Sequence, residues 1–347
     1  MSQPNDKAKA LRGRNALALF DKGKDTWNET IHQYSRIDFS GLDFNSDPNR
    51  SASFDNYIFP APASFRGTLF DAADVSFCNT HFAQGPVLFD KAEFGEGTVD
   101  FSGTRFEGAG LSFMEARFGN GDVRFDGCHF SDGDVDFGGA RFGRGTVSLT
   151  NAQFGYGDVD FSDVHFGDGS FDLAGAKFGK GSVNFVETRF GDGNVDFSNT
   201  HFGDGNTFFN KAQFGNGNIY FDRALFSNGV VAFGAVNFAD GNVSFHSGEF
   251  SESVVSFMDA VFGSGNIDFG EANFHNCGIH FNNTDFGQGD VSFIKADLNT
   301  SELHLDNTVS NGKPFTLPER SSVKSRFIRK SADLFRQIVN SSDRSKP

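Results

Sequence analysis

The segments VDFSGTRFEGAG (residues 99–110), VRFDGCHFSDGD (123–134) and VDFSNTHFGDGN (195–206) are copies of one 12-residue unit. Each copy carries an aliphatic residue, a Phe, a small residue and a second Phe, and its other positions are mostly polar or Gly. Phe residues at alternating spacings of 5 and 7 repeat this unit almost without fault from Phe65 to Phe293. A unit this short can bury its apolar residues only by stacking on its neighbours, which predicts a solenoid.

The apolar positions of the unit come in pairs that are two residues apart. An extended backbone places Val99 and Phe101 on one face, and likewise Thr104 and Phe106, with the residue between each pair on the other face. One unit therefore predicts two short strands, each followed by a turn. The Phe residues at these inward positions are the expected structural core, represented by Phe101, Phe106, Phe137, Phe142, Phe185, Phe190, Phe197 and Phe202.

Two units are expected to form one four-sided coil of about 24 residues. A 12-residue coil would have two sides, and sheets packed about 10 Å apart leave too little room for two Phe, a Val and an Ala. The turn sequences also alternate from unit to unit. Turns that start at Gly95 and at every second unit after it are nearly all Gly-x-Gly, whereas those that start at Glu107 are more varied. This alternation is expected if successive units lie on opposite sides of a coil.

The motifs IDFSG at residues 37–41, VDFSG at 99–103 and VDFSN at 195–199 resemble the pentapeptide-repeat family, whose pattern is A-(D/N)-(L/F)-(S/T)-x. The resemblance extends roughly from Ile37 to Leu305. It implies an all-β solenoid, a right-handed, four-sided parallel β-helix. The 7-residue spacing departs from the family pattern by the Gly-x-Gly insertion, which should widen alternate corners. Glycine is expected there because sharp corners need a positive φ.

Short helical caps are expected at both ends, which divides the chain into an N-terminal cap (1–36), the β-helix (37–308) and a C-terminal part (309–347). Residues 5–21 predict one helix of the N-terminal cap. A second should start at Thr26, which forms a capping-box pattern with Glu29. Trp27 is expected to cover the open end of the first coil, because an uncovered end exposes Phe side chains and unpaired strand edges.

The C-terminal part is expected to contain a linker, a basic amphipathic helix over 321–339 and a disordered tail. This helix is expected to cap the last coil or to mediate self-association, and the resemblance implies a homodimer through the C-terminal ends. A second candidate contact is the loop that lengthens the first coil. The candidate interaction residues are Phe327, Leu334, Phe335 and Ile338 of the helix and Asp47, Asn49 and Arg50 of the loop.

Charge is spread unevenly along the chain. The chain has 30 basic and 45 acidic residues. Residues 1–36 hold 7 basic and 4 acidic residues, and residues 309–347 hold 9 basic and 3 acidic residues. The body between them therefore has 14 basic and 38 acidic residues, a net charge of −24. No direct nucleic-acid binding is expected on the body, because phosphates must be neutralised by the opposite sign. The absence of an apolar run of about 18 residues argues against membrane insertion and favours a cytoplasmic location.

No catalytic, cofactor or metal site is expected. The three cysteines, Cys78, Cys128 and Cys277, match no disulfide or metal-ligand spacing. The run from Asp132 superficially suggests calcium, but it has Phe137 where an EF-hand loop needs Gly. The chain is therefore predicted to be no enzyme.

The expected function is a noncatalytic protein-interaction or scaffold rod with an acidic surface and an unknown protein partner. The alternative, implied by the resemblance, is a DNA-mimicking regulator that binds a type II topoisomerase such as gyrase. About ten to eleven coils at ~4.8 Å make a rod on the order of 50 Å long. A net charge of −24 then gives one charge per ~2 Å, close to the ~1.7 Å of duplex DNA.

Overall fold

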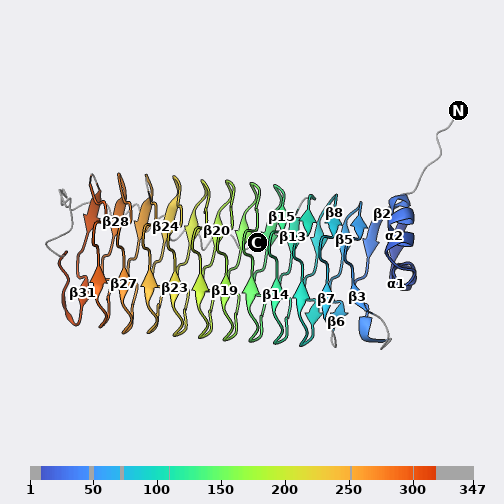
Figure 1. Cartoon of the computed structure of the whole chain (residues 1–347), viewed down its shortest axis with the longest axis horizontal. Helices are drawn as coiled ribbons and strands as arrows, with labels where there is room; N and C mark the ends of the chain where they lie inside the picture. The colour runs from blue at the N-terminus through green and yellow to red at the C-terminus, as the bar shows by residue number, and fades with distance from the viewer. Residues whose placement is uncertain are drawn as a thin grey trace.

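In the computed structural model the chain winds into a straight rod of stacked coils, with two short helices at its N-terminal end (Figure 1). The structure describes residues 9–46, 51–70, 74–108, 110–250, 252–299 and 301–317. Strands of successive coils pair in parallel, so that Val135 pairs with Val159 and Val159 with Val183. The predicted four-sided parallel β-helix with about 24 residues per coil is therefore confirmed.

Two wide sides of the coil are continuous sheets. The first sheet has 13 strands in the order β1 (Lys9–Arg12), β2 (Tyr34–Asp38), β5 (Ala63–Ser64), β9 (Val87–Leu88), β13 (Gly110–Ser112), β16 (Asp134–Asp136), β18 (Val159–Asp160), β20 (Val183–Asn184), β22 (Thr207–Phe208), β24 (Val230–Ala232), β26 (Val254–Ser256), β28 (Gly278–His280) and β30 (Glu302–His304). The second has 11 strands, β3 (Ala52–Ser53), β7 (Val75–Ser76), β11 (Val99–Asp100), β14 (Val123–Arg124), β17 (Val147–Ser148), β19 (Phe171–Asp172), β21 (Val195–Asp196), β23 (Ile219–Tyr220), β25 (Val243–Ser244), β27 (Ile267–Asp268) and β29 (Val291–Ser292).

The two narrow sides carry the second Phe of each unit. One comprises β4 (Ile58–Phe59), β8 (His81–Phe82), β12 (Arg105–Phe106) and β15 (His129–Phe130), and the other β6 (Leu69–Phe70) and β10 (Glu93–Phe94). Single parallel bridges continue the narrow side of β15 as far as Asp297 and the narrow side of β10 as far as Val309. Both narrow sides therefore keep the same register from coil to coil as the sheets.

The core contains four columns of stacked side chains that are nearly all Phe, together with columns of aliphatic and small residues. Phe185 and Phe209, one coil apart, stack with ring centroids 4.8 Å apart and an interplanar angle of 2°. Phe185 also meets Phe197 of the facing sheet edge-on, at 5.5 Å and 78°. Aromatic rings prefer these offset and edge-to-face arrangements. All eight Phe named above as the expected core are at most 7% exposed.

The N-terminal cap differs from its prediction in two places. The helix predicted over 5–21 is wrong over Lys9–Arg12, which form β1, whereas α1 (Arg14–Phe20) is helical as predicted. The extended segment pairs with β2 and so covers the edge of the first sheet. The second helix, α2 (Lys24–Thr30), follows Gly23 without a side-chain cap, so the Thr26 capping box is also wrong. A 3-10 turn, η1 (Ile31–Gln33), follows.

Trp27 lies over the first coil, as predicted. Its side chain is fully buried and its ring stacks on Phe39 with centroids 5.8 Å apart. The indole Nε1–H donates a hydrogen bond of 2.9 Å to the carbonyl oxygen of Ile58. A second 3-10 turn, η2 (Phe44–Ser46), begins the lengthened loop of the first coil.

A hairpin of β31 (Val309–Ser310) and β32 (Lys313–Pro314) lies at the C-terminal end of the described chain. Phe315 follows it and packs on Phe286, with ring centroids 4.8 Å apart, and on Phe293 at 6.4 Å. These contacts place an aromatic side chain on two of the core columns where they end. The helix predicted over 321–339 lies outside the described residues.

The corners use glycine for a reason that the sequence analysis did not predict. Positive φ occurs mainly two residues after the Phe of a wide sheet, and mostly at residues other than Gly, such as Asn151 and Asn199. In a typical Gly-x-Gly corner, Gly167 and Gly169 have no positive φ. A Cβ at Gly169 would lie 2.1 Å from the carbonyl oxygen of Gly145, one coil below. Glycine is needed there because the corner backbones stack too closely for a side chain.

Candidate interaction surface

The outward side chains of the two narrow sides form rows that run along the rod. Each residue of a row forms a parallel bridge with its counterpart in the next coil, so side chains repeat once per coil, about 4.8 Å apart. The Arg117 row comprises Asp43, Leu69, Glu93, Arg117, Arg141, His165, Arg189, Gln213, Asn237, Val261, Asp285 and Val309. The Asp297 row comprises His81, Arg105, His129, Gln153, Lys177, His201, Leu225, Glu249, Asn273 and Asp297.

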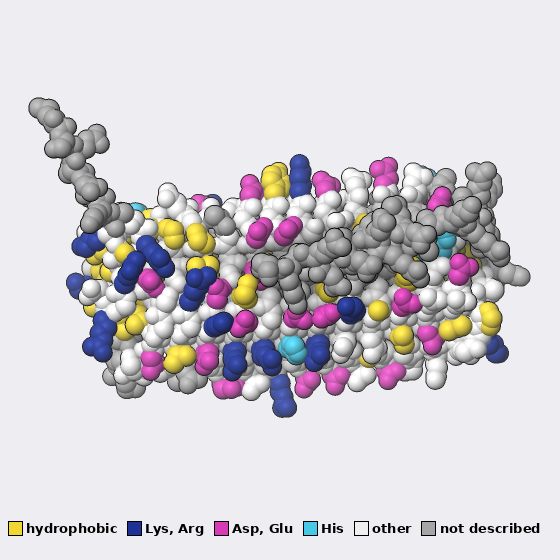
Figure 2. Space-filling view, turned by 180° about the vertical axis from the view of Figure 1, so that it is seen from behind, with side chains coloured by type: hydrophobic (Ala, Val, Ile, Leu, Met, Phe, Trp, Pro, Cys, Tyr) yellow, Lys and Arg dark blue, Asp and Glu magenta, His cyan; other side chains and the backbone are white. Residues whose placement is uncertain are grey.

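In both rows the basic residues end before the C-terminal third of the rod, and the later residues are neutral or acidic. Three arginines and a histidine follow Glu93 in the Arg117 row, and Asp285 lies near its far end. On the face shown in Figure 2, Lys and Arg side chains are most frequent toward the end that bears the N-terminal helices. The basic side chains of the two rows therefore lie away from the C-terminal end of the rod, where the acidic members Asp285 and Asp297 lie.

The arginines of the Arg117 row are exposed, and Arg117, Arg141 and Arg189 form no ion pair within the described part of the chain. Nearby glutamates are engaged by lysines instead: Glu115 lies 3.4 Å from the ammonium of Lys91, and Glu187 lies 3.0 Å from that of Lys211. Stacking like charges one coil apart costs electrostatic energy. The register of the Phe residues beneath fixes this arrangement, as in Phe118 and Phe142, whose rings stack 4.5 Å apart.

Many carboxylates of the body have structural roles. At one corner position, Asp122 accepts a hydrogen bond of 3.0 Å from the backbone N–H of Thr146, one coil later. Asn194 does the same for the N–H of Asn218 at 2.9 Å. Since both Asp122 and Asn194 accept this bond, it needs a side-chain oxygen acceptor rather than a charge. Part of the acidity of the rod therefore has a structural cause.

Outward carboxylates of the wide sheets also shape turns. Asp136 accepts the N–H of Gly138 at 2.7 Å, and Asp172 accepts the N–H of Ala174 at 2.8 Å. Burial raises the pKa of both carboxyl groups, and the neighbouring carboxylates Asp160 and Asp196 add to the rise. The close stacking of the coils thus disfavours the charged form of these groups, although their turn hydrogen bonds favour it.

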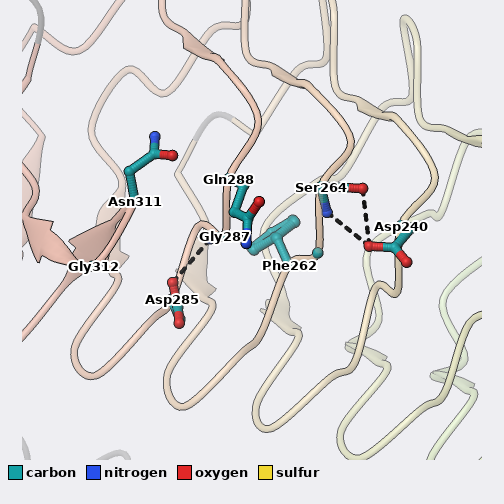
Figure 3. A pocket seen from close by; sticks show the side chains of 9 residues that line it. Asp240, Phe262, Ser264, Asp285, Gly287, Gln288, Asn311 and Gly312 are labelled. Atoms are coloured by element: carbon teal, nitrogen blue, oxygen red, sulfur yellow. Dashed lines mark hydrogen bonds between the residues drawn. The ribbon is translucent and has the colours of Figure 1, made fainter.

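A hollow of about 640 Å³ lies at the corners near the C-terminal end (Figure 3). Its acidic side chains are occupied by local hydrogen bonds. Asp240 accepts the N–H of Ser264 at 2.9 Å and its hydroxyl at 3.0 Å, and Asp285 accepts the N–H of Gly287 at 2.9 Å. Figure 3 shows these side chains beside separate turns rather than converging on one point. The hollow has the features of a groove between corners, not of a catalytic pocket.

The small position of the unit has a hydrogen-bonding role that the sequence analysis missed. Thr104 Oγ1–H donates to the carbonyl oxygen of Phe77 at 2.6 Å, and Cys128 Sγ–H donates to that of Phe101 at 2.9 Å. Burial raises the pKa of the Cys128 thiol far above its usual value. The occurrence of Thr and Cys in a column of Ala was the signal for this role. Within the described ranges, no three His, Cys, Asp or Glu side chains could together hold a metal ion.

The predicted contact residues cannot be placed on this surface. Asp47, Asn49 and Arg50, and likewise Phe327, Leu334, Phe335 and Ile338, lie outside the described residues. No helix in the described part of the chain is long and apolar enough to cross a membrane. The candidate surface among the described residues consists of the two rows, whose residues were visible in the sequence as outward positions of the repeat.

Comparison with known proteins gives one sequence match and weak structural similarity. No curated protein sequence matches the chain. A solved full-length structure of QnrB1, described as a plasmid-mediated fluoroquinolone resistance protein, matches with a TM-score of 0.25 and 12% identity over 66% of this chain and 92% of that chain. A trypsin-treated variant of QnrB1 matches with a TM-score of 0.17 and 13% identity over 67% and 92%.

These structural similarities are too low to support the fold, which rests on the register between coils and the stacked core. The sequence match is local and specific. The family model of pentapeptide repeats, covering nine copies, matches residues 125–175, which include the central coils of the rod. The predicted resemblance is confirmed there, and the chain carries pentapeptide repeats.

Proposed function

We propose that the chain is a noncatalytic interaction rod that binds a protein partner along its length. The observation that carries this proposal is the Arg117 row, in which the exposed arginines Arg117, Arg141 and Arg189 line up within four successive coils and form no ion pair in the described chain. Catalysis needs groups that converge on a reacting atom, whereas the charged side chains of this rod are spread in lines. A linear array suits an extended, acidic protein surface.

The test is affinity capture from the source organism with quantitative comparison of variants. Replacing Arg117 and Arg141 with Ala should weaken partner binding about 5- to 30-fold, since two exposed charge contacts contribute about 0.5–1 kcal/mol each. The loss should shrink as salt rises. The control is replacement of Lys91 and Lys295 with Ala, which removes equal charge from residues paired to Glu115 and Glu271.

Equal weakening in the control would assign the effect to net charge and contradict a specific row. A partner retained equally by all the variants would also contradict it. In either case the binding surface lies elsewhere on the rod, and the proposed role of the Arg117 row is wrong.

A second candidate is a DNA mimic that binds a type II topoisomerase such as gyrase. The observation that favours it is the net charge of −24 between residues 37 and 308, which approaches the linear charge density of duplex DNA. If the rod mimics DNA, micromolar protein should inhibit supercoiling by gyrase, and the inhibition should weaken as salt rises. Absence of inhibition at low salt would remove this candidate. The basic rows on both narrow sides favour the first proposal.

A further inference from the structure

The outward row of the first sheet changes character halfway along the rod. In β16 and β18 its residues are the carboxylates Asp136 and Asp160. In later coils they become Phe208, Ala232 and Ser256, followed by two histidines in β28 and β30. Ala232 is 2% exposed and Ser256 only 1%, although both lie between inward-facing neighbours. These two side chains are less exposed than the half-buried Asp136 and Asp160 of the earlier coils.

The adjacent corner position changes in the same coils. Asp134 and Asp158 are exposed there in the earlier coils, whereas Val230 and Val254 take their place later. We call the outward residues of this region the apolar strip. It comprises Phe208, Val230, Ala232, Val254 and Ser256.

Acidic side chains flank the apolar strip on both sides. Asp204 and Glu252 are exposed at the corners on one side, Asp259 and Asp306 are exposed on the other, and the exposed Glu302 follows Val254 and Gly278 in the same column. His280, which continues the strip, has its pKa lowered to about 4 by burial and by His304. It is therefore uncharged at neutral pH and does not repel a cation. An apolar surface between two acidic margins is suited to an amphipathic segment with basic edges.

The chain itself contains such a segment. Residues 318–347 carry eight basic and three acidic residues, and the helix predicted over 321–339 has Phe327, Leu334 and Ile338 on its apolar side. A 19-residue helix is about 28 Å long. The strip and its two histidines span five coils, on the order of 19 Å between the first and last strand. The segment is long enough to cover the whole strip.

The path of the chain also directs this segment toward the strip. The hairpin of β31 and β32 reverses the chain, and Phe315 N–H donates to the carbonyl oxygen of Thr308 at 2.9 Å. The hairpin therefore brings Phe315 back beside Thr308 at the C-terminal end of the rod. Leu317, the last described residue, is partly buried against the core. The undescribed segment therefore follows a residue held at the C-terminal end of the rod, where the first sheet also ends.

We propose that residues 321–339 dock on the apolar strip, with their basic side chains beside the flanking carboxylates. The segment then covers the outer face of the first sheet from β30 back to β22. Its binding site is a side of the rod within the same chain. This differs from the expected roles of capping the last coil or joining two rods.

Hydrogen exchange of the full-length chain, measured by mass spectrometry, tests this proposal. We expect peptides from 321–339 to exchange at least tenfold more slowly than an unstructured chain. Ala232→Arg places a cation in the centre of the strip and should abolish that protection. Leu334→Asp should abolish it from the other side without altering the rod. The matched control is Tyr220→Arg, at an outward position of the second sheet.

Far-ultraviolet circular dichroism and the thermal midpoint establish that each variant keeps its coils. Exchange of 321–339 at the unprotected rate in the unaltered chain would overturn the proposal. Protection that survives Ala232→Arg would also overturn it, since the segment would then be held elsewhere, for example over the last coil. Protection that disappears on dilution, together with a dimeric mass by light scattering, would show that the segment docks on a second copy of the chain. That outcome would also contradict docking within one chain.

Discussion

Replacing Phe185 with Ala should lower the free energy of unfolding by about 3–5 kcal/mol, the usual cost of truncating a core Phe. The ring is fully buried. It stacks on Phe161 and Phe209 at 4.8 Å in the neighbouring coils and meets Phe197 edge-on at 5.5 Å. The coils above and below are held in register by the rest of the column, so they cannot close the resulting cavity. Urea denaturation followed by circular dichroism measures the loss.

The control is Gln213→Ala, an exposed residue of the Arg117 row, which should change stability by no more than about 0.5 kcal/mol. An outward position is not always neutral. Asp196 accepts the N–H of Ser198 at 2.7 Å, so Asp196→Ala should cost about 0.5–1.5 kcal/mol. If Phe185→Ala and Gln213→Ala gave the same midpoint, the assignment of inward and outward faces would be wrong.

Gly169→Asn should destabilise the rod by about 1–3 kcal/mol or more, because it forces side-chain atoms into a closely packed site. A Cβ at this position would lie 2.1 Å from the carbonyl oxygen of Gly145 and 2.4 Å from that of Arg144. Both atoms belong to the backbone of the coil below and cannot move aside without separating the corners. Thermal unfolding of the variant and the unaltered chain measures the effect.

The matched control places the same residue at a different glycine. Gly127 has a φ of +61°, and a Cβ there would meet nothing within 4 Å. Asn151 and Asn199 occupy the same position of the repeat with φ of 58° and 57°. Gly127→Asn should therefore change stability by no more than about 0.5 kcal/mol. If Gly127→Asn were the more damaging of the two, backbone conformation rather than close approach would explain the glycines.

The repeat, the coil and the core could be predicted from the sequence. Alternation along a strand assigns residues such as Val99 and Phe101 to one face without reference to the rest of the fold. The volume of two Phe per unit excludes a two-sided coil, and the alternating turns indicate two distinct corners. A short repeat supports such deductions because its neighbours are further copies of itself.

Features that depend on contact between coils could not be predicted in this way. The reason for Gly169 is the backbone of Gly145, which is distant in sequence but lies directly below it in the structure. Extended structure in Lys9–Arg12 replaces the predicted helix because β2 offers an unpaired edge, and pairing with it outweighs local helix propensity.

The surface, too, has features that follow from the sequence and features that depend on contact between coils. The sequence alone determined which residues point outward, and therefore that arginines recur in the Arg117 row. Only the tertiary structure decided which of these charges are free of ion pairs. Lys91 and Lys211 form ion pairs with neighbouring glutamates, whereas Arg117 and Arg141 form no ion pair in the described chain. It likewise brought Phe208, Ala232 and Ser256 together into one strip. The period of a repeat determines the direction of each side chain, but its partners are set by the stacking of one coil on the next.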